Sequence, residues 1–268
     1  LALLSVFLPV NDLNIAGMTM SVYNLISQYI LIIGSIVALV FLAVAGNEKR
    51  AAAGLTRQNW KSAVLIVLAF VGIYIVRTVV SVAVQGVSDG SGMQYVKEWA
   101  AMFKNPMMWL NIAALPINYF FVFIAFFGEE YGWRYYLQPV LQKRFGLRAG
   151  VIILGVVWGL WHIPDDLFYY TQTSGIQMIF AQQITCISLG IFFAYAYMKT
   201  QNIWVPVCLH YLNNNLIPII SGTFSADVLE NQTVSWKDLP VALVLNGLCF
   251  GFFLLADVFK KKEVQEEE

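Results

Sequence analysis

Seven apolar runs, most of them long enough to cross a membrane, constrain the fold of this chain more than any other feature. A helix needs about 20 apolar residues to span the hydrocarbon core of a bilayer. The runs lie at about 24–46, 63–84, 107–128, 149–164, 176–198, 201–221 and 239–259. Hydrophobic residues make up 59% of the chain and charged residues only 12%. The sequence therefore predicts an all-α fold, a polytopic integral membrane helix bundle with seven to eight transmembrane helices.

Two segments do not fit a simple span. The run 149–164 is short, and it crosses a membrane only if the helix is tilted or continues past Pro164. Residues 1–10 are apolar but too few to span, so we interpret them as the tail of an eighth helix. A signal peptide is less favoured, because no basic segment precedes them. No loop exceeds about 22 residues, which leaves no room for a soluble domain. We expect one transmembrane domain over 1–268.

The distribution of Lys and Arg predicts the orientation. Twelve of the sixteen lie in the loops 47–62, 129–148 and 199–200 and in the tail 260–268. Only three lie in the alternate loops 85–106, 165–175 and 222–238, and Arg77 falls inside the second run. Basic residues gather on the cytoplasmic side, so we expect a multi-pass protein of the cell membrane with a cytoplasmic C-terminus. No basic patch with interleaved aromatic residues lies outside these loops, so no nucleic-acid partner is expected.

Two adjacent glutamates end the third apolar run. Ionisable groups are costly in a bilayer and commonly mark functional sites there. Glu130 and Arg134 are spaced i, i+4 and can form an ion pair on one helix face. Glu129 points roughly a quarter-turn away. We therefore expect Glu130 to pair with Arg134 and Glu129 to serve as a free base. The alternative is that both carboxylates merely mark the cytoplasmic end of the helix.

The chain has only two histidines, and both lie in apolar runs. Trp158 and His162 are spaced i, i+4, so the indole should lie on the histidine's face of the helix. His162 lies roughly 20 Å from the cytoplasmic helix end and needs a partner. His210 and Asn214 are also spaced i, i+4 and project to one side, near the middle of the membrane. Pro164 should bend or end the helix.

Several nearby residues are expected to have no catalytic role. Asp165 and Asp166 follow the His162 segment and are expected to be solvated at the outer boundary of the membrane. Asn213 and Asn215 flank Asn214 but should point to other faces of the helix. The three cysteines lie in apolar runs and are interpreted as small buried hydrophobic residues (Cys186, Cys208 and Cys249).

The candidate residues supply a free carboxylate, two imidazoles and a carboxamide. A carboxylate with an imidazole can take a proton from water. An imidazole N–H and an amide N–H can stabilise the developing oxyanion. This set is sufficient for hydrolysis without a covalent intermediate. Neither Gly-x-Ser-x-Gly nor a cysteine paired by pattern with a base is present. Ser188 and Cys186 are therefore unsupported candidates for a nucleophile.

Three motifs follow one another along the chain: Glu129-Glu130-x-x-x-Arg134, Trp158-x-x-x-His162 and His210-x-x-x-Asn214. Together and in this order they resemble the CAAX protease and bacteriocin-processing family, also called CPBP or Abi. That family includes the type II CAAX prenyl endopeptidases. The resemblance covers about residues 107–221, and it implies an eight-helix membrane core. Trp158 stands where the motif usually has Phe, and the aromatic packing role is retained.

The resemblance also implies a role for each motif residue. It assigns activation of the hydrolytic water to Glu129 and His162, and the oxyanion site to His210 and Asn214. Glu130 and Arg134 would shape and charge the pocket. The implied mechanism is metal-free and uses no cofactor. A zinc ion held by Glu129, His162 and His210 is the minority alternative, because such groups are plausible zinc ligands although no His-Glu-x-x-His is present.

The expected function is therefore an intramembrane glutamate-type endopeptidase. Its partners would be the lipid bilayer and a peptide or protein substrate that reaches a membrane cavity. The substrate would be a prenylated CAAX-like peptide or a bacteriocin-like or signal-like peptide. Two alternatives remain open. One is a non-catalytic immunity or binding protein of the same fold. The other is a transporter that relays protons, which the lack of an internal repeat disfavours.

Overall fold

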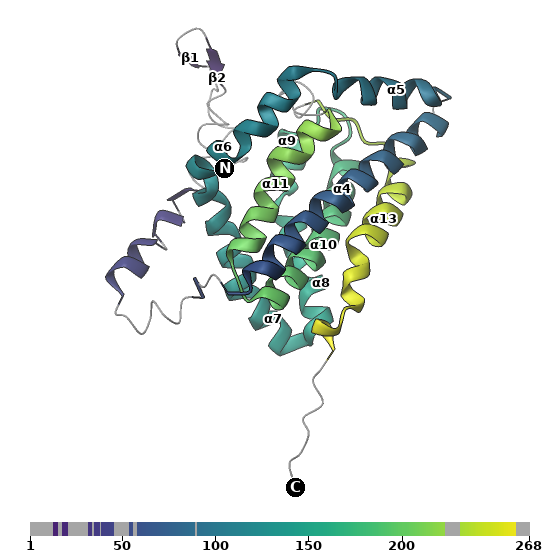
Figure 1. Cartoon of the computed structure of the whole chain (residues 1–268). Coiled ribbons are helices and arrows are strands. Elements are labelled where there is room, and N and C mark those ends of the chain that lie inside the picture. Colours follow the sequence, from purple (N-terminus) through teal and green to yellow (C-terminus); the bar gives the residue numbers. More distant parts are fainter. Residues whose placement is uncertain are drawn as a thin grey trace.

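The computed structural model describes residues 13–15, 18–20, 32–33, 35–37, 39–45, 54–55, 58–88, 90–222 and 231–260. Its body is a bundle of α-helices (Figure 1). The helices are α4 (Trp60–Ser88), α5 (Met93–Met102), α6 (Pro106–Glu130), α7 (Gln138–Phe145), α8 (Leu147–Trp161), α9 (Ile163–Phe168), α10 (Gly175–Thr200), α11 (Trp204–Ser221) and α13 (Asp238–Cys249). A short antiparallel pair, β1 (Leu13–Ile15) and β2 (Met18–Met20), is the part of the described structure that an all-α expectation did not include.

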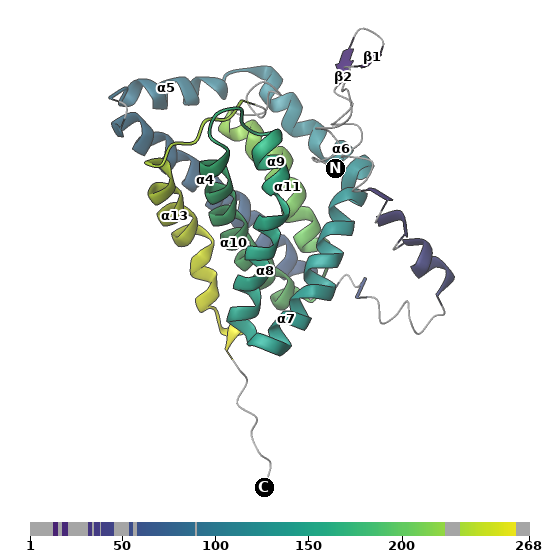
Figure 2. The ribbon, with the colours of Figure 1, turned by 180° about the vertical axis from the view of Figure 1, so that it is seen from behind.

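Helix α10 lies at the centre of the bundle. It packs against α4, α8, α9, α11 and α13, and these helices surround it when the molecule is seen from both sides (Figures 1 and 2). Residues 188–194 of α10 are all buried. Phe192 and Phe193 contact Phe70 of α4, and Phe192 also contacts Phe250 beyond α13. A helix that is apolar around most of its surface is expected at such a buried position.

Glycine residues allow α8 and α10 to approach closely. A Cβ atom added to Gly155 of α8 would lie 2.6 Å from the Cα atom of Ile187 on α10. A Cβ added to Gly190 of α10 would lie 3.4 Å from the Cα atom of Gly155. Small residues at a helix contact are a general device for close packing within membranes. This contact holds α8, with its histidine, firmly against the central helix.

Four helical segments are long and apolar enough to cross a membrane, judged by length and composition. They are Trp60–Val87, Pro106–Phe145, Leu147–Phe168 and Gly175–Thr200, and they correspond to the second to fifth runs of the sequence. The short run 149–164 is completed because the chain continues in α9 past Pro164. The chain is therefore a membrane protein with a helical bundle fold, as expected.

The last two runs are shorter as helices than the sequence predicted. The run 201–221 forms α11, which has 18 residues. The run 239–259 forms α13 with 12 residues, and then tightens into the 3-10 turns Gly251–Leu255 and Asp257–Phe259. The first run is described only in part, with helical residues between 32 and 44, and residues 1–10 lie outside the described part. The tail from 261 also lies outside it.

One expected loop contains a helix. Most of the segment 85–106 was expected to be irregular, but it holds α5, which lies across one end of the bundle (Figure 1). The indole N–H of Trp99 in α5 donates to the carbonyl oxygen of Ile220 at the end of α11, at 2.9 Å. The Trp99 ring also meets the ring of Phe103 edge to face. The Trp99 hydrogen bond fixes α5 to the same end of the bundle as the C-terminal end of α11.

Candidate active site

The site begins where α6 changes its helical geometry. The α-helix ends at Glu130, and a π-helical segment follows over Tyr131–Leu137. Single π-helical turns are rare and are frequent at functional sites. The expected ion pair is present here, with Arg134 Nε 2.9 Å from Glu130 Oε2 and both side chains fully buried. Arg134 Nη1 also donates to the carbonyl oxygen of Gly190 on α10, at 3.2 Å.

A second base reaches the same carboxylate from α11. His210 Nδ1 lies 2.9 Å from Glu130 Oε1, and the imidazole is buried. A carboxylate only accepts hydrogen bonds, so Nδ1 carries the hydrogen and Nε2 faces the other way. The sequence predicted the Arg134 partner of Glu130, but it gave His210 no link to Glu130. One carboxylate thus connects α6, the π-helical segment and α11.

Trp158 lies between the two histidines. Its ring centroid is 5.5 Å from that of His210 and 5.9 Å from that of His162, and both contacts are edge to face. The Arg134 guanidinium carbon lies 5.4 Å from the Trp158 ring centroid, close enough for a cation–π interaction. The indole therefore spaces the two imidazoles and covers one side of the Glu130–Arg134 pair. The aromatic residue of this motif has a geometric role, as expected.

His162 occupies the break between α8 and α9. It caps α8, and Pro164 begins the next helical turn. His162 Nδ1 lies 2.8 Å from the carbonyl oxygen of Trp158. Because a carbonyl oxygen only accepts, Nδ1 carries the hydrogen and the other ring nitrogen, Nε2, is left as an acceptor. The imidazole is partly exposed, so Nε2 can receive a hydrogen bond from water or a substrate.

The other two catalytic candidates, Glu129 and Asn214, are accessible to solvent. Glu129 is partly exposed, and within the described residues its carboxylate forms no salt bridge. Asn214 is exposed on α11. Its Oδ1 accepts a hydrogen bond from Asn213 Nδ2 at 2.8 Å. Asn213 therefore does not point away from Asn214 as its helical position suggested. This contact leaves the Asn214 amide nitrogen as the atom available to a ligand.

Asp166 corrects one expectation. It was expected to be solvated, but it is fully buried, and neither carboxylate oxygen has a hydrogen-bond partner among the described residues. The reason is that α9 extends the helical path beyond the break, so Asp166 follows His162 by four residues and faces the bundle. Its backbone N–H donates to the carbonyl oxygen of His162 at 2.9 Å.

Neither candidate nucleophile is placed for attack. Ser188 donates its hydroxyl hydrogen to the carbonyl oxygen of Ile184, one turn earlier, at 2.8 Å. Cys186 is 1% exposed, and its Sγ lies 3.9 Å from His162 Nδ1. That nitrogen already donates to the Trp158 carbonyl, so it cannot also accept the thiol hydrogen. Free cysteines are expected to behave as buried apolar residues here.

The donors do not form a metal site in this arrangement. Among the described residues, no group of three or more His, Cys, Asp and Glu side chains is placed to hold a metal ion. His210 and His162 each have Nδ1 engaged, by Glu130 and by a backbone carbonyl. These hydrogen bonds leave Nε2 of each ring free, as in metal-ligating histidines, so zinc stays an alternative proposal and no step is derived through an ion.

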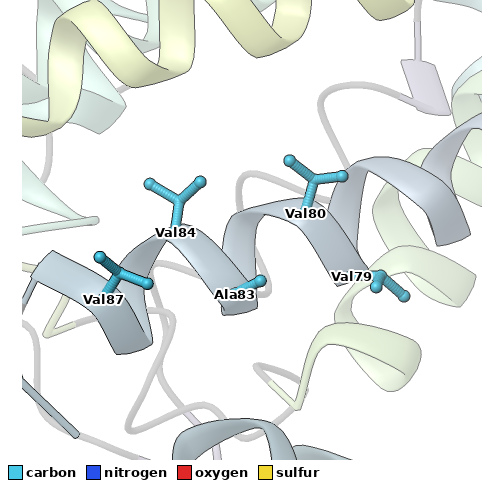
Figure 3. Close-up of a pocket in the computed structure, with 5 residues that line it drawn as sticks. All are labelled: Val79, Val80, Ala83, Val84 and Val87. Carbon is cyan, nitrogen blue, oxygen red and sulfur yellow. The ribbon is translucent and has the colours of Figure 1, made fainter. Parts of the chain in front are cut away.

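A pocket on α4 is separate from this cluster. It is lined by apolar side chains from one helix, Val79, Val80, Ala83, Val84 and Val87 (Figure 3). None of the candidate site residues lines it. An apolar helix face of this kind is what a bilayer requires of a lipid-facing surface. The chemistry is therefore sought at the Glu130–Trp158–His210 cluster.

The segment that carries this cluster matches a known family. Residues 111–216 match the family model described as type II CAAX prenyl endopeptidase Rce1-like. Through this segment the chain is similar to the type II CAAX prenyl endopeptidases. All the motif residues of the sequence analysis, from Glu129 to Asn214, lie inside it.

One curated relative is similar to part of the chain. The chain is 27% identical over 125 residues to CAAX prenyl protease 2 of Methanococcus maripaludis. This match covers 43% of the chain and 45% of the relative, so the chain spans about half the length of the curated protein that it matches. No solved structure matches the chain. The segment of the chain that matches the family model runs from α6 to α11, and it holds the Glu130–Trp158–His210 cluster.

Proposed function

We infer that this protein is an intramembrane endopeptidase that hydrolyses a peptide bond with a water molecule activated by Glu129 and His162. The observation that carries this inference is the placement of both histidines against the single indole of Trp158, beside a buried Glu130–Arg134 pair. The match of residues 111–216 to the CAAX protease family supports it.

The first step is attack by water on the peptide carbonyl carbon. The Glu129 carboxylate is unpaired within the described residues, so it can accept a proton from water. His162 Nε2 can accept a hydrogen bond from the same water and fix its direction. As the oxygen–carbon bond forms, the carbonyl π electrons move to the carbonyl oxygen, which becomes an oxyanion.

The oxyanion is stabilised by N–H donors from α11. Asn214 offers its amide nitrogen, because its oxygen is held by Asn213. His210 donates Nδ1–H to Glu130, so its Nε2 can donate only when the ring carries both hydrogens. The Glu130 carboxylate stabilises that doubly protonated ring. Loss of one such donor typically lowers kcat by about 10²- to 10³-fold.

Collapse of the tetrahedral intermediate completes the reaction. The oxyanion electrons re-form the carbonyl, and the carbon–nitrogen bond breaks. Glu129, now protonated, gives its proton to the leaving amine, and the carboxylate is restored. Glu130 and Arg134 take no part in proton transfer. Their role is to position His210 and Trp158, because each is fully buried and engaged with the other.

The substrate is a peptide or protein that reaches a cavity in the membrane, either a prenylated CAAX-like peptide or a bacteriocin-like or signal-like peptide. The relative named above is a CAAX prenyl protease, which favours the first class. In this proposal the chain lies in the cell membrane with a cytoplasmic C-terminus, because the basic residues concentrate in one set of loops. Fusions of alkaline phosphatase and of green fluorescent protein to the C-terminus test that orientation, and only the fluorescent fusion should be active.

The decisive experiment is peptide cleavage by the detergent-purified protein. A lipid-modified CAAX peptide and a mixed peptide library are offered to the wild type and to Glu129→Gln. Activity should fall by at least about 10²-fold in Glu129→Gln, while its thermal unfolding midpoint stays that of the wild type. Glu98→Gln changes an exposed carboxylate on α5 in the same way and is the matched control.

The same assay separates the alternatives. Cleavage should survive a zinc chelator, and loss that added zinc restores would support the zinc-dependent alternative instead. A non-catalytic immunity or binding protein should cleave no peptide and should keep its biological effect with Gln at position 129. Cleavage that is equal in wild type and Glu129→Gln would remove the glutamate mechanism.

A further inference from the structure

A chain of hydrogen bonds runs from α4 to Asn214. The Tyr74 hydroxyl donates to Asn213 Oδ1. Asn213 Nδ2 in turn donates to Asn214 Oδ1 at 2.8 Å. Tyr74 is 4% exposed and packs edge to face against Phe70, so its hydroxyl is held in place by the core. Asn213 is the middle member, and it both accepts and donates.

This chain has a direction, and the direction matters for an oxyanion. An asparagine side chain offers a donor nitrogen and an acceptor oxygen that are nearly equal in shape. With its oxygen held by Asn213, Asn214 presents its nitrogen to a ligand. If the chain ran the other way, Asn214 would present its oxygen and would repel an oxyanion. A nearly symmetric amide therefore needs a neighbour that selects one of its two orientations.

Arg77 favours the observed direction. Its guanidinium carbon lies 5.7 Å from the centroid of the Tyr74 ring, and its Nε donates to Asn246 Oδ1 on α13 at 2.9 Å. A cation beside an aromatic ring interacts with its electron-rich face. Electron density is drawn from the phenol oxygen, which makes the hydroxyl a better donor and a poorer acceptor. A hydroxyl that donates to Asn213 Oδ1 fixes every later bond of the chain.

We propose that Tyr74 and Asn213 are positioning residues that orient the Asn214 amide so that its nitrogen faces the oxyanion. This proposal rests on the function proposed above, because it deepens the role given there to Asn214. Neither residue touches the substrate in it. Tyr74 acts through Asn213, and Asn213 acts through Asn214.

The test compares four substitutions with a cleaved lipid-modified CAAX peptide. Asn213→Asp keeps the acceptor for Tyr74 but cannot donate, so it should turn the Asn214 amide around and lower kcat nearly as far as Asn214→Ala does. Tyr74→Phe removes one hydroxyl and should lower kcat by about 3- to 10-fold, the size of one net hydrogen bond. KM should stay unchanged in both. Asn215→Ala is the matched control, because within the described part of the chain that amide donates to the Tyr211 carbonyl of its own helix and not to Asn214.

The same substitutions in an Asn214→Ala protein separate a positioning role from general damage to the fold. In an Asn214→Ala protein, Tyr74→Phe and Asn213→Asp should cause no further loss of kcat. A further loss there, or full activity of both variants in the wild-type background, would overturn the proposal. If Asn214→Ala itself is fully active while Glu129→Gln is not, the oxyanion role of Asn214 fails and this proposal fails with it, but the glutamate mechanism stands.

The hydrogen-bond chain is also measurable without a substrate. Tyr74→Phe and Asn213→Ala should couple in a double-mutant cycle on unfolding in detergent, with the double variant less destabilised than the two single losses added together. Strict additivity would show that the Tyr74–Asn213 bond does not form, and it would overturn the proposal whether or not the protein cleaves the peptide.

Discussion

Glu130 on α6 and His210 on α11 are joined across the bundle by a hydrogen bond of 2.9 Å, although 80 residues separate them in the sequence. The same carboxylate accepts from Arg134 through its other oxygen. Two basic side chains therefore share one buried acid. In a low-dielectric interior such a group is stable only with its partners in place, because an unpaired buried charge is heavily penalised.

The first prediction concerns this shared carboxylate. Glu130→Gln leaves the buried Arg134 charge uncompensated, and Arg134→Gln leaves Glu130 with His210 alone. Each should lower the free energy of unfolding by about 3–5 kcal/mol. The double variant should lose clearly less than the sum, because the two side chains act as a unit. Chemical unfolding in detergent measures this, with Glu98→Gln as an exposed control. Additive losses would contradict the ion-pair role.

The second prediction concerns Cys186, whose thiol lies 3.9 Å from His162 Nδ1. Its short distance to a histidine invites a role as nucleophile, but that nitrogen already donates to a carbonyl. Cys186→Ala should therefore keep kcat within about twofold, while His162→Ala should lose about 10²-fold or more. Initial rates with one cleaved peptide give both numbers. Loss of activity in Cys186→Ala without loss of folding would point to a covalent mechanism.

The third prediction concerns Trp158. Its indole N–H is buried and has no hydrogen-bond partner among the described residues, so the ring alone does the packing. Trp158→Phe keeps an aromatic ring between the imidazoles, so it should lower the free energy of unfolding by clearly less than Trp158→Ala does. Trp158→Ala leaves a cavity and should lose about 3–5 kcal/mol together with activity. Thermal unfolding of the two variants side by side checks this, and equal losses would contradict the packing role.

Local spacing explains which parts of the site could be predicted from the sequence. Glu130 and Arg134 are one helical turn apart, and so are Trp158 and His162, so their contacts follow from helix geometry alone. The Glu130–His210 bond joins helices that meet only through the tertiary packing of α6 with α11. No periodicity in either segment indicates that contact. The match of both segments to one family was the only signal for it.

Tertiary packing also explains why some of the sequence predictions were wrong. Asp166 was expected to be solvated at the outer boundary of the membrane, but α9 carries the helix onward and turns the side chain inward. Helical position placed Asn213 on another face from Asn214, yet its short amide reaches sideways along the helix surface. The run 239–259 looked long enough to span, but apolar composition does not distinguish an α-helix from the 3-10 turns that follow Cys249. Hydropathy indicates which segments prefer an apolar environment, whereas the length of the α-helix that such a segment forms also depends on packing.

The last prediction concerns Arg77, the one cation inside an apolar run in the sequence. Its Nε donates to Asn246, which is 2% exposed. Asn246→Leu removes the acceptor and should lower the free energy of unfolding by about 1.5–3 kcal/mol, as expected for a hydrogen bond to a charged group. Arg77→Met in the same protein removes the charge as well. The double variant should recover part of the loss, because it leaves no unpaired cation beside the apolar leucine side chain at position 246 and Arg77 is only partly buried. Unfolding in detergent measures the wild type and both variants, and a double variant that is less stable than Asn246→Leu would show that the contact of Arg77 with the Tyr74 ring also stabilises the fold.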